Sequence, residues 1–288
     1  MSYQIIQGDA RNLPLADKSI DLTITSPPYL DARRYGRDDI ARGCGEWVAF
    51  MLAVTIEALR VTRGLVLWVC AGVTRDNEYQ PGPEGLVWAA YQKGLCLWRP
   101  CIWTKNGLPG TGGAQWLRND WEYVLAFKNS GPLPWADPLA TGKPPKYRNG
   151  GRFRNRGQDD QRGDGAYPVI KVANPGNVVH VTVGGGHLGH PLAHENEAPF
   201  PEPLVEFFAR SFCPPGGTVL DPFCGSGTTI AVARKLGRNG IGVDIRDDQV
   251  DLAKRRVSDA RYEPQAAAED IGVGGATDPV TTGEGEAA

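Results

Sequence analysis

Apolar and polar positions follow two different periods along this chain, and the period distinguishes strands from helices. Short apolar runs bounded by Gly, Pro or Asp predict strands, whereas apolar residues three and four positions apart predict helices. Residues 65–70 (L-V-L-W-V-C) are apolar throughout, as the buried strands of a parallel sheet are. The predicted strands cover residues 4–7, 20–25, 65–70, 95–103, 121–127, 218–221 and 240–245, and the predicted helices cover residues 46–61, 203–212, 228–236 and 247–260.

Strands and helices alternate after residue 203, and this alternation is typical of a doubly wound α/β sheet. We expect a mostly parallel sheet with an antiparallel hairpin at one edge. Between residues 131 and 197 Gly, Pro, Arg and Asn dominate, and little periodicity remains outside residues 178–183, which predicts an insertion. Residues 263–288 are acidic, rich in Gly and Ala and without pattern, so we expect a disordered tail.

Composition is that of an ordinary globular protein, with 41% hydrophobic and 22% charged residues in 288. No run approaches the roughly 18 apolar residues of a membrane span, and the N-terminus lacks the layout of a signal peptide. A cytoplasmic location without membrane association is therefore expected. The six cysteines form no C-x-x-C pair, which predicts reduced core residues and no metal site.

Charge is distributed unevenly, although the net charge is only −2. Basic residues gather between positions 143 and 162, with Tyr147 and Phe153 among them, and the acidic tail offsets them. A stretch of this kind is either a solvated loop or a contact with nucleic acid, and its interleaved aromatics favour the contact. The predicted nucleic-acid-binding residues are Lys146, Arg148, Arg152, Arg154 and Arg156.

A glycine-rich turn follows the strand at residues 218–221, in the sequence V-L-D-P-F-C-G-S-G-T-T. Glycines here let the backbone approach a ligand at the edge of an α/β sheet. The third glycine of a dinucleotide fingerprint and the lysine of a P-loop are both missing. Asp244 ends the next strand, where it could accept the ribose hydroxyls of a nucleoside cofactor, and Asp9 could accept its adenine amino group.

A second motif, T-S-P-P-Y at residues 25–29, ends the strand at residues 20–25. Its prolines cannot continue a central strand, and they fix the turn rigidly. Alone, such a segment also suits a simple turn beside a core tyrosine.

In this order the two motifs resemble the DNA amino-methyltransferase family, which transfers a methyl group from S-adenosylmethionine to cytosine N4 or adenine N6. The order matches the permuted beta group, with a Rossmann-like sheet and a target-recognition region between the motifs. The resemblance implies a methyltransferase domain over residues 1–262, with a catalytic half at 1–130, a recognition insertion at about 131–197 and a cofactor half at 198–262. It implies target-base contacts at Ser26, Pro27, Pro28 and Tyr29, and cofactor contacts at Asp9, Phe200, Asp221, Phe223, Gly225, Gly227, Thr228 and Asp244.

Two further segments are similar to this family. Residues 103–106 and 118–123 resemble the part that closes the catalytic half, and A-P-F-P at 198–201 resembles the approach to the cofactor, with Phe200 beside the methionine moiety. The implied partners are double-stranded DNA and a cognate restriction endonuclease that acts on the same site, in a bacterial, archaeal or phage-encoded system.

The chemistry of this family suits the second motif. The lone pair of an aromatic amine is delocalised into the ring, so the amine is a poor nucleophile. Hydrogen bonds from a flipped base to the Ser26 hydroxyl and the Pro27 carbonyl would draw the nitrogen toward sp³ geometry, and Tyr29 would stack on the base. Holding both reactants in line can lower the barrier by roughly 7–11 kcal/mol. Serine at position 26 is similar to the cytosine-N4 enzymes, so we expect cytosine, with adenine N6 as the alternative.

Other interpretations remain open at this stage. A C5-cytosine enzyme needs a thiolate, which Cys101 after Pro100 could supply. His187, His190 and His194 with Glu195 could form a metal site, although they lack helical spacing and suit a DNA-facing or solvated loop better. A catalytically inactive DNA-binding protein on the same scaffold, or an enzyme that methylates RNA, would carry similar motifs.

Overall fold

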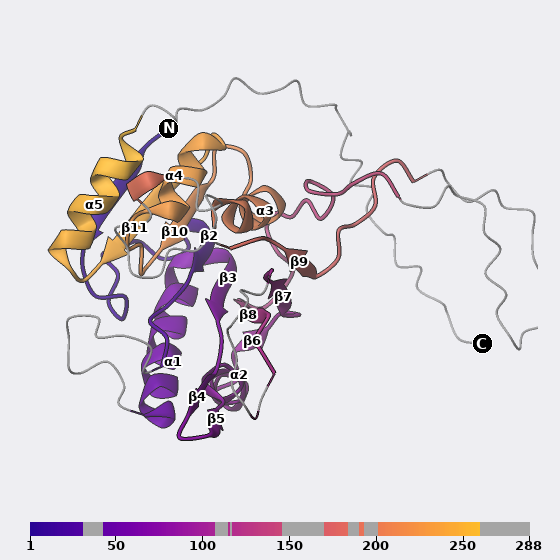
Figure 1. The fold of residues 1–288 in the computed structure, drawn as a ribbon. Coiled ribbons are helices and arrows are strands. Elements are labelled where there is room, and N and C mark those ends of the chain that lie inside the picture. The colour runs from indigo at the N-terminus through magenta and orange to yellow at the C-terminus, as the bar shows by residue number, and fades with distance from the viewer. Residues whose placement is uncertain are drawn as a thin grey trace, which may run out of the picture.

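A computed structural model describes residues 1–30, 43–106, 115, 117–145, 170–183, 190–192 and 201–259. Within these residues nine strands form one sheet, whose main order is β1-β11-β10-β2-β3-β8-β7-β9, while β6 pairs with β8 (Figure 1). The strands of this sheet are β1 Tyr3–Gln7, β2 Ile20–Thr25, β3 Thr62–Cys70, β6 Cys96–Leu97, β7 Cys101–Thr104, β8 Trp121–Lys128, β9 Val178–His180, β10 Thr218–Asp221 and β11 Asn239–Asp244.

The sheet is mostly parallel, as the sequence predicts. Strands β1, β11, β10, β2 and β3 run parallel to one another. Strand β8 runs antiparallel to both β3 and β7, which gives the predicted hairpin, and β9 adds a parallel strand beyond it. Because β9 lies within the predicted insertion, this part of the insertion belongs to the sheet.

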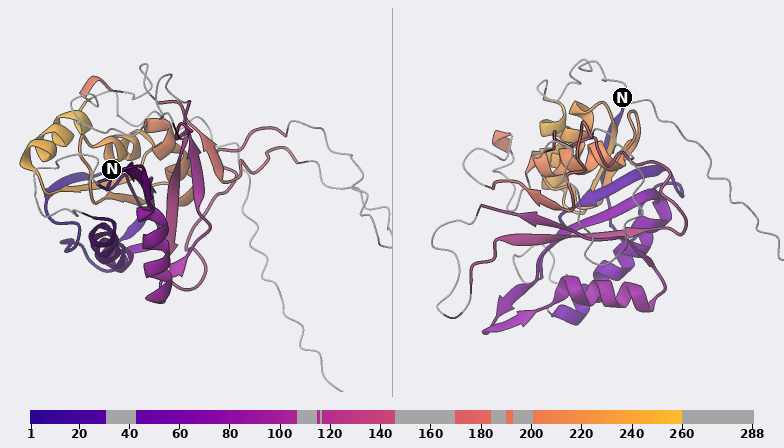
Figure 2. Two further views of the ribbon diagram at one scale, coloured as in Figure 1. Left: turned by 60° about the horizontal axis from the view of Figure 1, so that its bottom comes forward. Right: turned by 90° about the vertical axis from the view of Figure 1, so that its right-hand side faces the viewer.

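Helices cover both faces of the sheet, so the architecture has three layers (Figures 1 and 2). On one face α3 and α4 pack against β2, β3 and β10, and α5 packs beside α4. On the other face α1 and α2 pack against β3 and β8. The helices are α1 Cys44–Val61, α2 Gly82–Gln92, α3 Glu202–Phe212, α4 Thr228–Lys235 and α5 Asp247–Val257.

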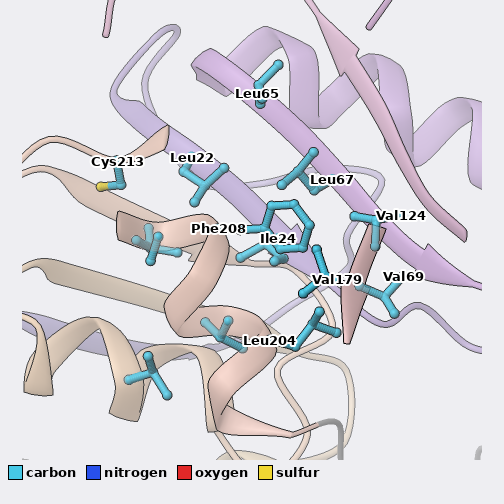
Figure 3. Packing of buried hydrophobic residues seen from close by; sticks show 14 of the residues in the cluster. Leu22, Ile24, Leu65, Leu67, Val69, Val124, Val179, Leu204, Phe208 and Cys213 are labelled. Atoms are coloured by element: carbon cyan, nitrogen blue, oxygen red, sulfur yellow. The ribbon is translucent and has the colours of Figure 1, made fainter. Parts of the chain in front are cut away.

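The hydrophobic core between α3 and the sheet follows from the two periodicities in the sequence. Alternate residues of β2 and β3 point toward α3, which presents Leu204 and Phe208 at helical spacing (Figure 3). Both of these side chains are fully buried. The largest cluster therefore joins strands from the N-terminal part of the chain to a helix from the C-terminal part.

One predicted strand is wrong, and three elements lie where none was predicted. The single strand expected at residues 95–103 is two short strands, β6 and β7, because Pro100 has no N–H to donate and the chain breaks its ladder before it. Helix α2 and the small antiparallel hairpin of β4 (Val73–Arg75) and β5 (Glu78–Gln80) were not predicted.

None of the described helices is both long enough and apolar enough to cross a membrane. The predicted acidic tail at residues 263–288 lies outside the described residues.

The packing of α3 predicts a large cost for truncating Leu204, near the start of this helix. Leu204→Ala should lower the free energy of unfolding by about 2–5 kcal/mol, because the side chain is fully buried against the sheet. Leu139→Ala, at a side chain that is 43% exposed, is the matched control and should change it by less than about 1 kcal/mol. Urea denaturation followed by tryptophan fluorescence measures both, and equal losses would contradict this account of the core.

Candidate active site

The two sequence motifs meet at one edge of the sheet. Carboxyl ends of parallel strands share an edge, and ligands of α/β proteins bind there. Strands β2 and β10 are direct neighbours, with Leu22 opposite Val219 and Thr23 opposite Leu220. Ser26, which follows β2, and the glycine-rich turn, which follows β10, therefore emerge side by side.

Asp221 holds the glycine-rich turn by hydrogen bonds to residues on both sides of it. Its carboxylate accepts the backbone N–H of Phe223 at 3.1 Å and the hydroxyl of Thr229 at 2.6 Å. The side chain is only 1% exposed. Burial raises the pKa of Asp221 from 3.8 to about 6, although the Thr229 hydroxyl acts in the opposite direction. The residue thus fixes the shape of the turn, and its predicted contact with a cofactor stays a prediction.

Two glycines of the turn need their positive backbone angles. Gly225 has φ +46° and Gly227 has φ +78°, values that L side chains rarely adopt. A Cβ on Gly227 would also lie 3.1 Å from the Cβ of Ala253 on α5. The chain then enters α4 at Thr228, so the first N–H groups of that helix face the same edge.

Asp244, at the end of β11, contacts the same turn. One carboxylate oxygen accepts the N–H of Gly225 at 2.9 Å, and the other accepts the N–H of Arg246 at 3.0 Å. Burial raises the pKa of Asp244, with the backbone donors acting against it. Each carboxylate oxygen can accept more than one hydrogen bond, so these contacts leave capacity for a pair of ligand hydroxyls.

Asp9, after β1, is placed at this edge but is bound to Arg11. The Arg11 guanidinium approaches its carboxylate to 2.6 Å and also lies 5.6 Å from the ring centroid of Phe50. Phe50, from α1, contacts Phe223 of the turn with ring centroids 6.1 Å apart. Carboxylates at two strand ends, an aromatic pair and glycines at positive φ suit the hydroxyls, amine and ring of a nucleoside, so the residues present fit S-adenosylmethionine.

The T-S-P-P-Y motif at residues 25–29 is connected to two residues that the sequence did not single out. The Ser26 hydroxyl donates to the Tyr29 hydroxyl at 3.3 Å, and Tyr29 donates to Glu122 of β8 at 2.6 Å. Lys105 lies 2.5 Å from the other carboxylate oxygen of Glu122. Burial, followed by the adjacent Glu122 charge, holds the pKa of Tyr29 well above its ordinary value.

Helix α1 fixes the prolines of the motif. The indole N–H of Trp47 donates to the Pro28 carbonyl at 2.7 Å, and Trp47 itself is 1% exposed. Pro27 and Pro28 are both buried. The backbone from which Ser26 and Tyr29 project is therefore held by the core of the protein.

Arg256, also not singled out from the sequence, connects the glycine-rich turn to α3. It is fully buried, and one guanidinium nitrogen donates to the hydroxyls of Ser226 at 3.0 Å and Thr228 at 2.7 Å. The other bonds to Glu202, the first residue of α3, at 2.8 Å. The only signal in the sequence was the helical spacing, which puts the charged Arg256 on the same face of α5 as the apolar residues Leu252 and Ala253.

Several predicted residues cannot be placed. Phe200 and all five predicted nucleic-acid contacts, Lys146, Arg148, Arg152, Arg154 and Arg156, lie outside the described residues, as do His187, His194 and Glu195. Among the described residues no group of three or more His, Cys, Asp or Glu could hold a metal ion. Burial raises the pKa of Cys101 to about 11, so the thiolate that a C5-cytosine enzyme needs would not form there at neutral pH.

Known proteins have sequences similar to that of this chain. The sequence profile of the DNA methylase family matches residues 20–255. The type II methyltransferase M.ScaI of Streptomyces caespitosus is 45% identical over 267 residues, which cover 88% of this chain and 80% of M.ScaI. The orphan methyltransferase M.BamHII of Bacillus amyloliquefaciens is 27% identical over 254 residues, which cover 84% of this chain and 90% of M.BamHII.

Solved structures share the fold. The cytosine-N4-specific PvuII DNA methyltransferase superimposes with a TM-score of 0.66 at 18% identity, covering 90% of this chain and 88% of its own. TTHA0409 of Thermus thermophilus, solved in complex with S-adenosyl-L-methionine, gives a TM-score of 0.58 at 24% identity, covering 91% of this chain and 95% of its own. At these identities the likeness extends to the architecture alone.

The buried carboxylate of Asp221 predicts a pH-dependent stability. Its pKa is higher in the folded protein than in the unfolded chain, so the folded state binds more protons between these values. Stability should therefore fall as pH rises from about 4 to about 6, by about 3 kcal/mol from this group. In Asp221→Asn that fall should disappear. Urea denaturation at several pH values measures it.

Asp251→Asn, at a side chain that is 76% exposed, is the control for this pH series. An Asp221→Asn variant with the same pH slope as wild type would mean that the carboxylate does not gain protons on folding.

The buried position of Arg256 predicts a second stability effect. Arg256→Met should lower the free energy of unfolding by about 3–5 kcal/mol, because it removes the cation that pairs with the Glu202 carboxylate. Arg255→Met, the same change at the exposed neighbouring position, should cost less than about 1 kcal/mol. Adding Glu202→Gln to Arg256→Met should recover part of the loss, and an additive further loss would refute the pairing.

Proposed function

We propose that this chain, which belongs to the DNA methylase family of S-adenosylmethionine-dependent enzymes acting on cytosine N4 or adenine N6, methylates the N4 amine of cytosine in DNA. The observation that supports this most is the position of Ser26. Its hydroxyl follows β2, directly beside the cofactor turn that follows β10. A base amine bound by Ser26 would therefore face a methyl donor bound by the turn.

S-adenosylmethionine supplies an electrophilic methyl group on a sulfonium sulfur. In our proposal Ser26 and the Pro27 carbonyl accept the hydrogen atoms of the amine, so that the nitrogen lone pair turns toward the methyl carbon. The nitrogen–carbon bond would form as the carbon–sulfur bond breaks with its electron pair on sulfur, and one amine proton would leave to solvent. The residues contribute orientation and fixed dipoles, and no covalent adduct with the protein is needed.

The cofactor contacts follow from the geometry at the strand ends. We assign the ribose hydroxyls to Asp244, whose oxygens already hold the turn and retain accepting capacity. We assign the adenine to the region of Phe223 and Asp9, where Phe50 and Arg11 add an aromatic face and a cation. Gly225, Gly227 and Thr228 offer backbone N–H groups, Asp221 supports them from below, and Phe200 would complete the methionine side.

The DNA contacts are proposed on charge and chain order. The basic residues Lys146, Arg148, Arg152, Arg154 and Arg156 lie in the predicted recognition insertion, between the two motifs in sequence. Phosphate contacts there would make affinity depend on salt. We further propose the division into a catalytic half, an insertion and a cofactor half within residues 1–262, followed by a disordered tail.

The biological setting follows from the relatives' names. M.ScaI is named a type II methyltransferase and M.BamHII an orphan methyltransferase. We therefore propose a modification enzyme located in the cytoplasm, and a cognate endonuclease that cuts the same site as the partner in the type II case.

Product analysis tests the proposed base. Unmethylated duplex DNA is incubated with the protein and S-adenosylmethionine, digested to nucleosides and examined by mass spectrometry. N4-methylcytosine is the expected product. N6-methyladenine would agree with the proposed mechanism but contradict cytosine as the target base. Methylation of RNA alone would contradict DNA as the substrate. Cofactor binding without any methylated nucleoside would favour an inactive DNA-binding protein.

Ser26→Ala should reduce the methylation rate by about 10²–10³-fold, because the amine loses its oriented hydrogen-bond acceptor. Affinity for S-adenosylmethionine, measured by calorimetry, should not change. Ser19→Ala is a matched control, since Ser19 precedes β2 at the opposite edge of the sheet and bonds only locally to Ala16. An unchanged rate in Ser26→Ala would remove Ser26 from the mechanism.

A further inference from the structure

Ser26 stands at the end of a short chain of hydrogen-bonded side chains. The chain runs from Ser26 Oγ to Tyr29 Oη over 3.3 Å and from Tyr29 Oη to Glu122 Oε2 over 2.6 Å. Lys105 closes it at 2.5 Å from Glu122 Oε1. Three separate segments thus contribute, because Lys105 follows β7 and Glu122 belongs to β8.

The antiparallel hairpin brings the charged pair together. Glu122 lies opposite Trp103 in the β7–β8 register, and the Lys105 N–H donates to the Asp120 carbonyl at 2.8 Å. Glu122 is 8% exposed. A carboxylate this deeply buried requires a cation and hydrogen-bond donors around it. Lys105 and Tyr29 supply both.

The chemistry of these groups fixes the direction of each hydrogen bond. An ionised carboxylate can only accept, so the Tyr29 hydroxyl must donate its proton to Glu122. That hydroxyl keeps its proton, because burial and the Glu122 charge hold the pKa of Tyr29 well above its ordinary value. With its own proton committed, the Tyr29 oxygen can bond to Ser26 only as an acceptor.

The direction of these hydrogen bonds determines which role is left to the Ser26 hydroxyl. A serine hydroxyl has one proton and two lone pairs, and it rotates to suit its neighbours. Donation to Tyr29 uses the proton and leaves the lone pairs. An exocyclic amine offers N–H groups, so it needs an acceptor in this place. A hydroxyl free to rotate could instead donate toward an acceptor on the base edge, which would orient the ring wrongly.

We propose that Glu122 is a positioning residue that acts through Tyr29 to keep the Ser26 hydroxyl in the accepting orientation, with Lys105 as the cation that pairs with Glu122. This inference rests on the proposed role of Ser26 toward the amine, and it holds for cytosine and adenine alike. It differs from a merely structural role of the Lys105–Glu122 pair, which would tie β7 to β8 without affecting Ser26.

A double-mutant cycle on the full chain distinguishes these roles. Single-turnover methylation of unmethylated duplex DNA is measured for wild type, Tyr29→Phe, Glu122→Gln and the double variant, together with the dissociation constants for S-adenosylmethionine and DNA. Each single change should reduce the methylation rate by about 10- to 100-fold, because the acceptor is no longer oriented. Both dissociation constants should stay unchanged.

The double variant decides the mechanism. If Glu122 acts through the Tyr29 hydroxyl, the double variant should be no slower than the slower single variant, since both changes break one chain. Multiplying effects, or a full rate in Tyr29→Phe, would overturn the inference. Tyr29→Phe keeps the ring and should fold normally, so it tests the inference even if Glu122→Gln unfolds.

Glu84→Gln is the matched control. Glu84 also accepts hydrogen bonds from tyrosine hydroxyls, those of Tyr79 at 2.8 Å and Tyr123 at 3.2 Å. Ser26, however, is linked through Tyr29 to Glu122 and not to Glu84. Glu84→Gln should leave the rate unchanged, and a loss equal to that of Glu122→Gln would assign both effects to general stability. Wild-type product analysis tests the proposed function separately, since it does not depend on Glu122.

Discussion

The parallel pairing of β2 with β10 is the constraint on which the whole site depends. These strands come from opposite parts of the chain, yet their ends carry the two motifs. Asp21 fixes the alignment at the far edge, where its carboxylate accepts the N–H of Thr218 at 2.9 Å and pairs with Arg63 at 2.6 Å. A slip of one residue would shift the strand ends by about 3.3 Å and turn every side chain to the other face. In-line transfer does not tolerate such a shift.

The strands that carry the site could be predicted because their signals are local. Alternation and terminal Pro or Gly located β2 and β10 at their observed bounds. Helix α2 was missed because its first residues, including Gly82, Pro83 and Gly85, suggest a turn. The structure shows why glycine is needed: a Cβ on Gly82 would lie 3.1 Å from Trp47, and one on Gly85 would lie 2.9 Å from Val48. Close helix packing has no signature in a single sequence.

The same limit applied to the site. The motifs located Ser26, Asp221 and Asp244 at the ends of predicted strands. Glu122 and Lys105 join that edge only through the antiparallel register of β7 and β8, and Arg256 only through the packing of α5. Each was visible as a charged residue in an apolar or amphipathic segment, but its partner lies far away in the sequence.

Three aspartates end parallel strands at this edge, and burial separates their roles. Asp221 is 1% exposed and its carboxylate is used within the turn, so it supports the site. Asp244 is partly buried and accepts the N–H of Gly225 in the turn. Its carboxylate oxygens can accept further hydrogen bonds from a ligand. Asp9 has a side chain that is 33% exposed and carries Arg11. Residue type alone therefore predicts an acidic edge, and only the surrounding contacts assign each carboxylate.

The placement of negative charge near Ser26 has a catalytic logic. A carboxylate at position 26 itself would attract the positive sulfonium already in the ground state, and such uniform attraction tightens binding without accelerating the chemical step. Here the carboxylate is Glu122, which Lys105 neutralises and which Tyr29 separates from Ser26. Glu122 acts on the amine only through the direction of the hydrogen bonds that link it to Tyr29 and Ser26. Hydrogen bonds in a buried chain strengthen one another. In the proposed mechanism the acceptor is therefore oriented toward the reacting nitrogen, and this motif places no unpaired charge beside the methyl donor.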